Sequence, residues 1–270
     1  NSAGQGQFIL ETEERYFTKA QIIISIYEDE KKEKEPAAPA QPVIQAPPVP
    51  PAVNKPRISW RQLIRSVPFS SGIILLCTLI FALVNAEKLI FQKTFIYDLL
   101  APGLFTMWNG AVWGLLSSAF VHYEIWHIFF NIMWAWYLGS VLEKIFKPGR
   151  YLLFIALSAI VSAGVQILLS QQAGIGYSGV IYAMVGYGLI ARREHEKLAA
   201  VLNKHNLFLI MVCFVLCIVL SPFVELRIAN GAHAGGLLFG LAVGAIQYHK
   251  RFKIPAALLT ALLVAAAVMS

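Results

Sequence analysis

The sequence has little charge and little cysteine for its length. Asp, Glu, Lys and Arg make up 14% of its 270 residues, whereas a soluble globular protein carries about 25%. Hydrophobic residues make up 57%, and the mean hydropathy is +0.63. This balance excludes a disordered chain, a disulfide-stapled secreted domain and an ordinary cytosolic globule. It predicts a membrane protein.

The three cysteines, Cys77, Cys213 and Cys217, all lie within apolar runs. None has a partner in a loop, so we expect neither a disulfide framework nor a cysteine-ligated metal. Cys213 and Cys217 share one helix face at i,i+4, where ordinary packing is the favoured interpretation.

The first 68 residues differ in composition from the rest. Residues 1–35 hold eight Asp/Glu against five Lys/Arg, are too few for an independent core, and are interpreted as a cytoplasmic appendage. Within them, residues 21–27 (QIIISIY) predict a strand. Residues 36–68 are interpreted as a linker, because residues 36–56 hold eight of the thirteen prolines. The linker ends in a basic amphipathic segment suited to an anionic membrane surface. Since the chain begins with Asn rather than Met, we expect its natural start to lie further upstream.

From residue 69 onward, apolar segments alternate with short loops. We expect membrane-embedded segments near residues 69–86, 123–143, 150–170, 178–191, 206–222, 231–249 and 254–269. Residues 69–250 are interpreted as the main domain and residues 251–270 as an additional apolar helix.

The basic residues sort onto alternate loops, fourteen on one side against three on the other. The larger set is Lys55, Arg57, Arg61, Arg65, Lys144, Lys147, Arg150, Arg192, Arg193, Lys197, Lys204, Lys250, Arg251 and Lys253, and the smaller is Lys88, Lys93 and Arg227. The asymmetry predicts a cytoplasmic N-terminus. The net charge of +7 is therefore a sign of membrane topology, and no nucleic-acid partner is expected.

The stretch between Asp98 and Lys144 holds about 45 mostly apolar residues, enough for two crossings of roughly 20 residues each. The distribution of basic residues places its two ends on opposite sides of the membrane. The chain must therefore cross the membrane an odd number of times within this stretch. About half of the stretch must then dip into the outer leaflet, which is tolerated only against protein or a water-filled cavity. We expect a re-entrant outer loop beside a cavity that opens outward.

Polar side chains within the predicted spans lie at a common depth. Four of them lie roughly 20 to 25 Å from the cytoplasmic ends of their helices, at about 1.5 Å per residue: His127, Asn131, Ser178 and His233. The segment 178–191 is too short to cross and must begin inside the membrane. Since ionisable groups inside a membrane are costly, this layer predicts a buried, wet functional site.

The residue types at this depth predict nucleophilic catalysis. Ser178 opens its helix two residues after Gly176, where free backbone N–H groups favour a developing oxyanion. A serine needs an adjacent base, and a neutral histidine such as His233 is the usual one. No Asp or Glu lies at this depth on the last two polar helices, which favours a Ser–His dyad over a triad. His127 and Asn131, at i,i+4, can both donate to one oxyanion.

Small residues predict that the serine and histidine helices approach closely. On the histidine helix they form a Gly-x3-Gly-x3-Gly ridge, Gly236, Gly240 and Gly244, and on the serine helix they are Gly179, Ala183 and Gly186. The small residues could serve helix packing alone. Such packing is compatible with a catalytic site and is also required to bring the serine and the histidine together.

With these motifs in this order, the chain resembles the rhomboid family of intramembrane serine proteases over roughly residues 69–250. The matching pieces are W-x-L-L-S-S-x-F-x-H at residues 113–122, H-x3-N at residues 127–131, YLGSVLE at 137–143, GYSGVIYAMVGY at 176–187 and GAHAGGLLFG at 231–240. The resemblance implies an all-α membrane protein with a six-transmembrane helix bundle and a re-entrant outer loop. Residues 254–269 would add a seventh C-terminal helix.

The resemblance also implies roles for individual residues. Ser178 would be the nucleophile and His233 the general base and acid, with an oxyanion hole formed by the Ser178 N–H, His127 and Asn131. The supporting residues implied are Tyr182, whose ring would stack on the histidine, the flanking Gly176 and Gly179, the structural His122 and Glu143, and Trp113 of the outer loop.

The family cuts transmembrane segments of other membrane proteins near their outer end, and uses no metal or organic cofactor. The resemblance therefore implies transmembrane protein substrates and the lipid bilayer as partners. It also implies a location in a cell membrane, namely the bacterial inner membrane.

Two departures from the family pattern are visible. Trp113 is followed by Gly114 where the family usually has arginine, which affects how the outer loop is anchored to lipid head groups. Tyr177 precedes the nucleophile where the family usually has a small residue, and we expect it to narrow the substrate cleft.

Two alternatives remain at this point. A catalytically inactive rhomboid-like protein that binds membrane clients typically lacks the serine or the histidine, and both are present here. A transporter or channel could use His122, His127 and His233 as a proton path. It would need paired discontinuous helices or an internal repeat, and the sequence shows no repeat.

Overall fold

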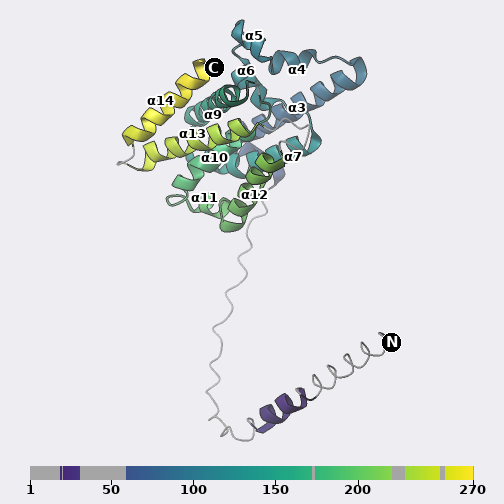
Figure 1. The fold of residues 1–270 in the computed structure, drawn as a ribbon, viewed down its shortest axis with the longest axis vertical. Helices are drawn as coiled ribbons and strands as arrows, with labels where there is room; N and C mark the ends of the chain where they lie inside the picture. Colours follow the sequence, from purple (N-terminus) through teal and green to yellow (C-terminus); the bar gives the residue numbers. More distant parts are fainter. Residues whose placement is uncertain are drawn as a thin grey trace, which may run out of the picture. The chain divides into compact units, whose positions relative to one another are not determined.

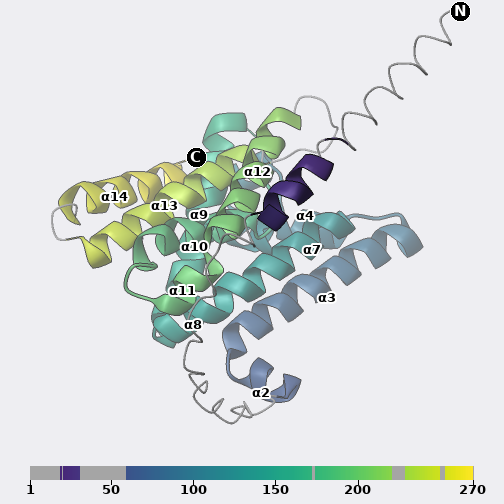
Figure 2. The same ribbon diagram turned by 90° about the horizontal axis from the view of Figure 1, so that it is seen from below.

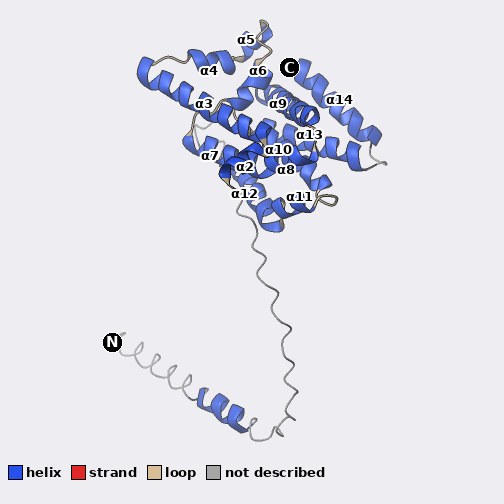
Figure 3. Cartoon of the chain, turned by 180° about the vertical axis from the view of Figure 1, so that it is seen from behind, coloured by secondary structure: helices blue, strands red, loops and turns tan. Residues whose placement is uncertain are grey.

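The computed structural model describes residues 19, 21–30, 59–171, 174–220, 229–249 and 253–269. The chain divides into two compact units, residues 1–56 and residues 57–270. In the described part of the chain every regular element is helical (Figure 3), which confirms the predicted all-α class.

The strand predicted over residues 21–27 is wrong, because residues 21–30 are helical. A strand must share its backbone hydrogen bonds with a neighbouring strand, and none of the described residues forms one. A helix satisfies its own N–H and C=O groups. The run of β-branched isoleucines favours a strand only where a sheet exists to receive it.

The apolar segments predicted from the sequence are helices in residues 57–270 (Figure 1). They are α3 (Pro68–Phe91), α7 (Ile125–Trp134) continuing through η2 (Ala135–Gly139) and α8 (Ser140–Ile145), α9 (Pro148–Ser170), α10 (Ser178–Ala191), α12 (Lys204–Leu220), α13 (Asn230–Tyr248) and α14 (Lys253–Met269). Among the described residues, three helical stretches are long and apolar enough to cross a membrane: 68–91, 125–145 and 148–170. The chain is a multi-pass membrane protein.

Short helices fill the connections. They are α2 (Trp60–Arg65), α4 (Phe95–Leu100), α5 (Leu104–Trp108), α6 (Gly114–Ser117), η1 (Ser118–Phe120) and α11 (Glu196–Val201). Four of them, α4 to η1, precede the long helix 125–145, so one helix long enough to cross lies between Asp98 and Lys144. This is the arrangement expected of a stretch with an odd number of crossings.

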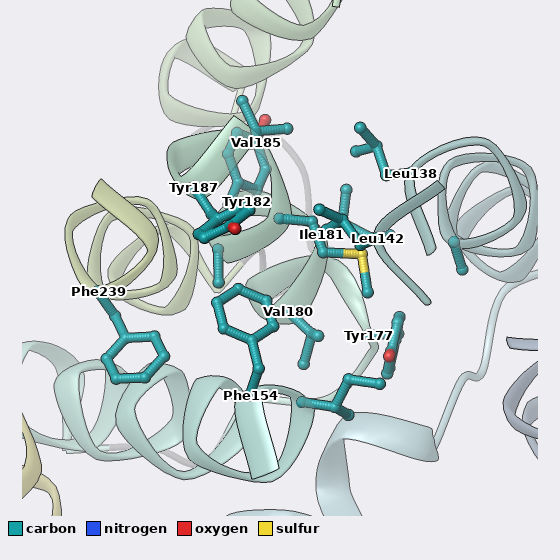
Figure 4. Packing of buried hydrophobic residues seen from close by; sticks show 14 of the residues in the cluster. Leu138, Leu142, Phe154, Tyr177, Val180, Ile181, Tyr182, Val185, Tyr187 and Phe239 are labelled. Atoms are coloured by element: carbon teal, nitrogen blue, oxygen red, sulfur yellow. The ribbon is translucent and has the colours of Figure 1, made fainter. Parts of the chain in front are cut away.

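Helix α10 lies at the centre of the bundle, in contact with α9 and α13 (Figure 1). Most of its residues are buried, which suits a helix that is apolar on all sides. Figure 4 shows its side chains packed between Phe154 of α9, Phe239 of α13 and Leu138 of η2. The start of α10 is thereby held at a fixed place inside the bundle.

The α10–α13 contact depends on the small residues of the predicted ridge. A Cβ added at Gly236 would collide with the carbonyl oxygen of Gly179, and one added at Gly240 would collide with that of Ala183. At Gly244 an added Cβ would meet Ile190 at 3.0 Å. Backbone therefore lies against backbone along the first two positions, as small residues allow between membrane helices.

Helix α3 lies beside α7 (Figure 2), and its start is capped by a side chain from α8. The Glu143 carboxylate accepts hydrogen bonds from the backbone N–H groups of Phe69 (2.9 Å) and Ser70 (2.7 Å). These are donors that a helix start leaves unpaired, and a negative charge there also suits the helix dipole. Glu143 thus ties α8 to α3.

Between α7 and α8 the helix widens for five residues into a π-helix, η2. π-Helical turns are rare and usually occur as single insertions within α-helices. At its end Gly139 has no room for a side chain, since an added Cβ would lie 2.8 Å from the Tyr151 hydroxyl oxygen.

Helix α14 packs against α9 and α13. It runs back along α13 (Figure 1). The additional apolar helix expected over residues 254–269 is therefore part of the bundle, on the α9 side of the central helix.

Candidate active site

Ser178 and His233 meet at the starts of two packed helices. Ser178 is the first residue of α10, and His233 lies in the first turn of α13. The Ser178 Oγ and His233 Nε2 atoms are 2.8 Å apart, within hydrogen-bond distance. With Nε2 as the acceptor of the serine proton, the ring proton of neutral His233 is on Nδ1. This is the nucleophile–base contact that serine catalysis requires.

Two aromatic rings enclose the histidine. The Tyr182 ring, one turn along α10 from the serine, stacks on His233 with ring centroids 4.6 Å apart and an interplanar angle of 30°. Phe214 of α12 lies 5.3 Å from Tyr182 and 6.3 Å from His233, centroid to centroid. The imidazole is buried, and its Nδ1 has no hydrogen-bond partner among the described residues. The imidazole is thus oriented by ring packing together with its contact to Ser178 Oγ.

The turn that leads into Ser178 requires glycine at position 176. Gly176 has φ +102°, a left-handed conformation that other residues rarely adopt. A Cβ there would lie 2.5 Å from the Nε2 atom of His127. The Gly176 N–H donates to the Ser118 carbonyl oxygen at 3.1 Å. The turn therefore brings the imidazole of His127 close to the chain just before the serine.

Asn131 lies one turn after His127 on α7 and is buried. Its Nδ2 donates to the His127 carbonyl oxygen at 2.8 Å, and its Oδ1 has no hydrogen-bond partner among the described residues. In this state the Asn131 amide is bonded within its own helix.

His122 supports the same turn, and its ring lies beside that of His127 with the centroids 5.0 Å apart. Its Nδ1 is 3.2 Å from the Phe120 carbonyl oxygen, and its Nε2 accepts from the Tyr177 N–H at 3.3 Å. The two bonds together require a neutral ring with the proton on Nδ1. Burial, with a smaller effect of nearby His127, lowers the pKa of His122 to about 3, which keeps the ring neutral at pH 7.

The expectation that Tyr177 narrows the substrate cleft does not fit the structure. The Tyr177 side chain is 1% exposed and lies within the main hydrophobic cluster, with its ring centroid 6.0 Å from that of Phe120. It is directed into the core because the N-terminal turn of α10 presents Ser178, and not its predecessor, to His233.

The second departure, Gly114, also has a packing reason. A Cβ at this position would lie 2.6 Å from Cγ of Pro102 and would collide with Met107. No side chain fits there. The preceding Trp113 donates from Nε1 to the Leu99 carbonyl oxygen at 2.9 Å, so the outer loop is fastened by its own residues.

Three buried polar residues of α9 were missed by the sequence analysis, Ser158, Ser162 and Gln166, and the last two lie beside the starts of α10 and α13. The Gln166 Oε1 accepts from the Ala232 N–H at 3.1 Å, next to His233. Ser162 lies against Gly179 and Gly236, and it lines a small cavity with Gly176 and Gly179. Their regular i,i+4 spacing on an apolar helix indicates a polar stripe along one face of α9.

The described residues contain no group of three or more His, Cys, Asp or Glu side chains placed to hold a metal ion. The candidate site consists of hydroxyl, imidazole and amide groups only.

Comparison with known proteins gives one family. Residues 109–250 match the Rhomboid domain family. Rhomboid protease GlpG of Klebsiella pneumoniae (strain ATCC 700721 / MGH 78578) is 32% identical over 183 residues, 67% of this chain and 63% of that protein. Rhomboid protease GlpG of Serratia proteamaculans (strain 568) is 33% identical over 187 residues, 68% of this chain and 64% of that protein. The chain thus spans a little under two thirds of the length of the curated relatives it matches.

Proposed function

The chain belongs to the rhomboid family, and we propose that it is an intramembrane serine endopeptidase with a Ser178–His233 dyad. The observation that carries the proposal is the 2.8 Å separation of Ser178 Oγ and His233 Nε2 at the start of a central helix. The relatives are named proteases, and both residues of the dyad are present here. A catalytically inactive relative would be expected to lack one of them.

In the first half of the proposed reaction, Ser178 Oγ attacks the carbonyl carbon of the scissile peptide bond while its proton passes to His233 Nε2. The tetrahedral intermediate carries its negative charge on the former carbonyl oxygen. The imidazolium then donates that proton to the nitrogen of the leaving peptide. The C–N bond breaks, and an acyl ester remains on Ser178.

In the second half, neutral His233 accepts a proton from a water molecule, which attacks the ester carbon. The ester bond breaks, the proton returns to Ser178 Oγ, and the new carboxylate leaves. Donors at the oxyanion position lower both barriers. They are the backbone N–H of Ser178 at the helix start, the His127 ring and the Asn131 amide. For this role Asn131 Nδ2 must leave the His127 carbonyl oxygen to which it is bonded.

The substrates proposed are transmembrane segments of other membrane proteins, cut near their outer end. The orientation proposed is a cytoplasmic N-terminus, by the excess of basic residues on that side. The relatives come from bacteria, and the location proposed is the bacterial inner membrane.

The test is cleavage in lipid. The full chain is reconstituted with a single-span substrate whose transmembrane segment is weakened by glycine and proline. We expect the wild type to cut it once within the segment and the Ser178→Ala form to cut nothing above background. Cleavage by the Ser178→Ala form equal to that by the wild type would contradict the mechanism. If the wild type bound the substrate and left it intact, the result would favour a client-binding protein.

Replacing Asn131 with alanine should weaken turnover by about a hundredfold, because one donor to the oxyanion is lost while others remain. The effect should fall on kcat and be smaller than that of Ser178→Ala. A matched control is Asn85→Ala, since Asn85 Nδ2 makes the same bond to a preceding helical carbonyl, that of Phe81 at 2.9 Å. We expect Asn85→Ala to retain wild-type kcat. If Asn131→Ala did the same, Asn131 would have no part in the oxyanion hole.

A further inference from the structure

A small cavity next to the serine turn is lined by two residues whose side chains each carry an unpaired polar atom. The cavity lies between α3, α7 and Tyr177, and half of its lining residues are aliphatic. The Tyr177 hydroxyl and Asn131 Oδ1 are both buried, and neither has a hydrogen-bond partner among the described residues. His122 also lines the cavity, but its two ring nitrogens are already bonded.

These two atoms are chemically complementary, since a tyrosine hydroxyl donates and an amide oxygen accepts. Leaving either one unpaired in a buried place is unfavourable. Most buried polar groups in proteins do find a partner, so two exceptions in one cavity need an explanation.

The bond that Asn131 makes in this state supplies the explanation. Its Nδ2 is held by the His127 carbonyl oxygen, so the amide is turned along its own helix. A donor role in the oxyanion hole requires Nδ2 to leave that carbonyl, and the Oδ1 atom on the same amide then turns as well. A donor in the cavity would decide which end of the amide faces the oxyanion.

From this geometry we infer that Tyr177 is a positioning residue, whose hydroxyl donates to Asn131 Oδ1 when Asn131 Nδ2 binds the oxyanion. This inference rests on the proposed function. The bond holds the amide with its donor end toward the developing charge and its acceptor end away from it. The bond also pairs the two buried polar atoms. Their unpaired burial in the resting state costs free energy, and this cost is relieved only in the transition state, which favours turnover.

The test is Tyr177→Phe, which removes the hydroxyl and keeps the ring. In proteoliposomes with the weakened single-span substrate, we expect kcat to fall about five- to tenfold, the effect of one hydrogen bond, with KM unchanged. In an Asn131→Ala background Tyr177→Phe should have no further effect, because the two residues act as one unit. A fluorophosphonate, which reacts with the serine without entry of a transmembrane segment, should label Tyr177→Phe more slowly by the same factor.

The matched control is Tyr151→Phe. Tyr151 is also 1% exposed, but its hydroxyl is paired with Ser70 Oγ at 2.8 Å. Losing that bond should lower the melting temperature of the full chain in detergent and leave kcat unchanged. Tyr177→Phe should do the reverse, with a melting temperature equal to or above that of the wild type, since the resting protein loses only an unpaired buried hydroxyl.

Three results would overturn the inference while the proposed function stood: wild-type kcat for Tyr177→Phe, the same loss in the Asn131→Ala background, or a lowered melting temperature that accounts for the loss. Failure of the proposed function is read separately, from a wild type that neither cleaves the substrate nor reacts with the fluorophosphonate at Ser178. In that case the inference falls with it.

Discussion

Replacing His233 with glutamine should abolish proteolysis, with kcat in proteoliposomes falling by about a thousandfold or more. Glutamine is of similar size and can still hydrogen-bond the serine, but its amide does not accept a proton at neutral pH. Ser178 then stays a neutral alcohol, and the leaving nitrogen receives no proton. The measurement is the rate of appearance of the cleaved transmembrane segment, with the melting temperature in detergent showing that the variant is folded.

His205→Gln is the control for this substitution. His205 lies in the first turn of α12 and is exposed, so the same exchange there should leave kcat unchanged. A His233→Gln variant that is folded and retains more than a tenth of wild-type kcat would show that another group removes the serine proton.

The second large effect is expected from Gly240→Leu, which should remove both folded protein and activity. An added Cβ meets the backbone of Ala183 and of Tyr187, and backbone inside a packed helix pair cannot move aside. Overpacking of this kind costs about 3 kcal/mol, and it would separate α10 from α13, on which the 2.8 Å contact between Ser178 and His233 depends. The yield of monodisperse protein and its melting temperature measure the first effect, and cleavage the second.

The control for Gly240→Leu is Gly72→Leu. Gly72 lies in α3 with nothing within 4 Å of an added Cβ, so the larger side chain should be accepted with little change in melting temperature. If Gly240→Leu were equally well tolerated, close backbone contact would not be what joins the serine and histidine helices.

The sequence was sufficient to predict the helices, because they follow from local patterns of apolar residues. Long apolar runs define α3 and α9, and the short run after a glycine-rich turn defines α10. The need for an odd number of crossings between Asp98 and Lys144 came from charge alone. Ser178 and His233 could be placed at one depth because the rise of a helix is constant.

Other features depend on contacts between elements, which a pattern along one element does not contain. The isoleucines at residues 21–27 have high strand propensity, but no described strand pairs with them. The burial of Tyr177 follows from the direction of the turn before α10. The Asn131 amide is bonded to its own helix, which its i,i+4 spacing from His127 does not indicate.

The π-helix η2 sets the angular relation between the two ends of the helix 125–145. One residue added to or removed from a helix turns everything beyond it by about 100°. On the N-terminal side of η2, His127 and Asn131 face the turn before Ser178, and on its C-terminal side Glu143 faces the start of α3. Without the wider turn, a straight α-helix could satisfy one of these alignments and would misdirect the other. The π-helical turn thus lets the two ends of one helix, one with His127 and Asn131 and the other with Glu143, contact different neighbours.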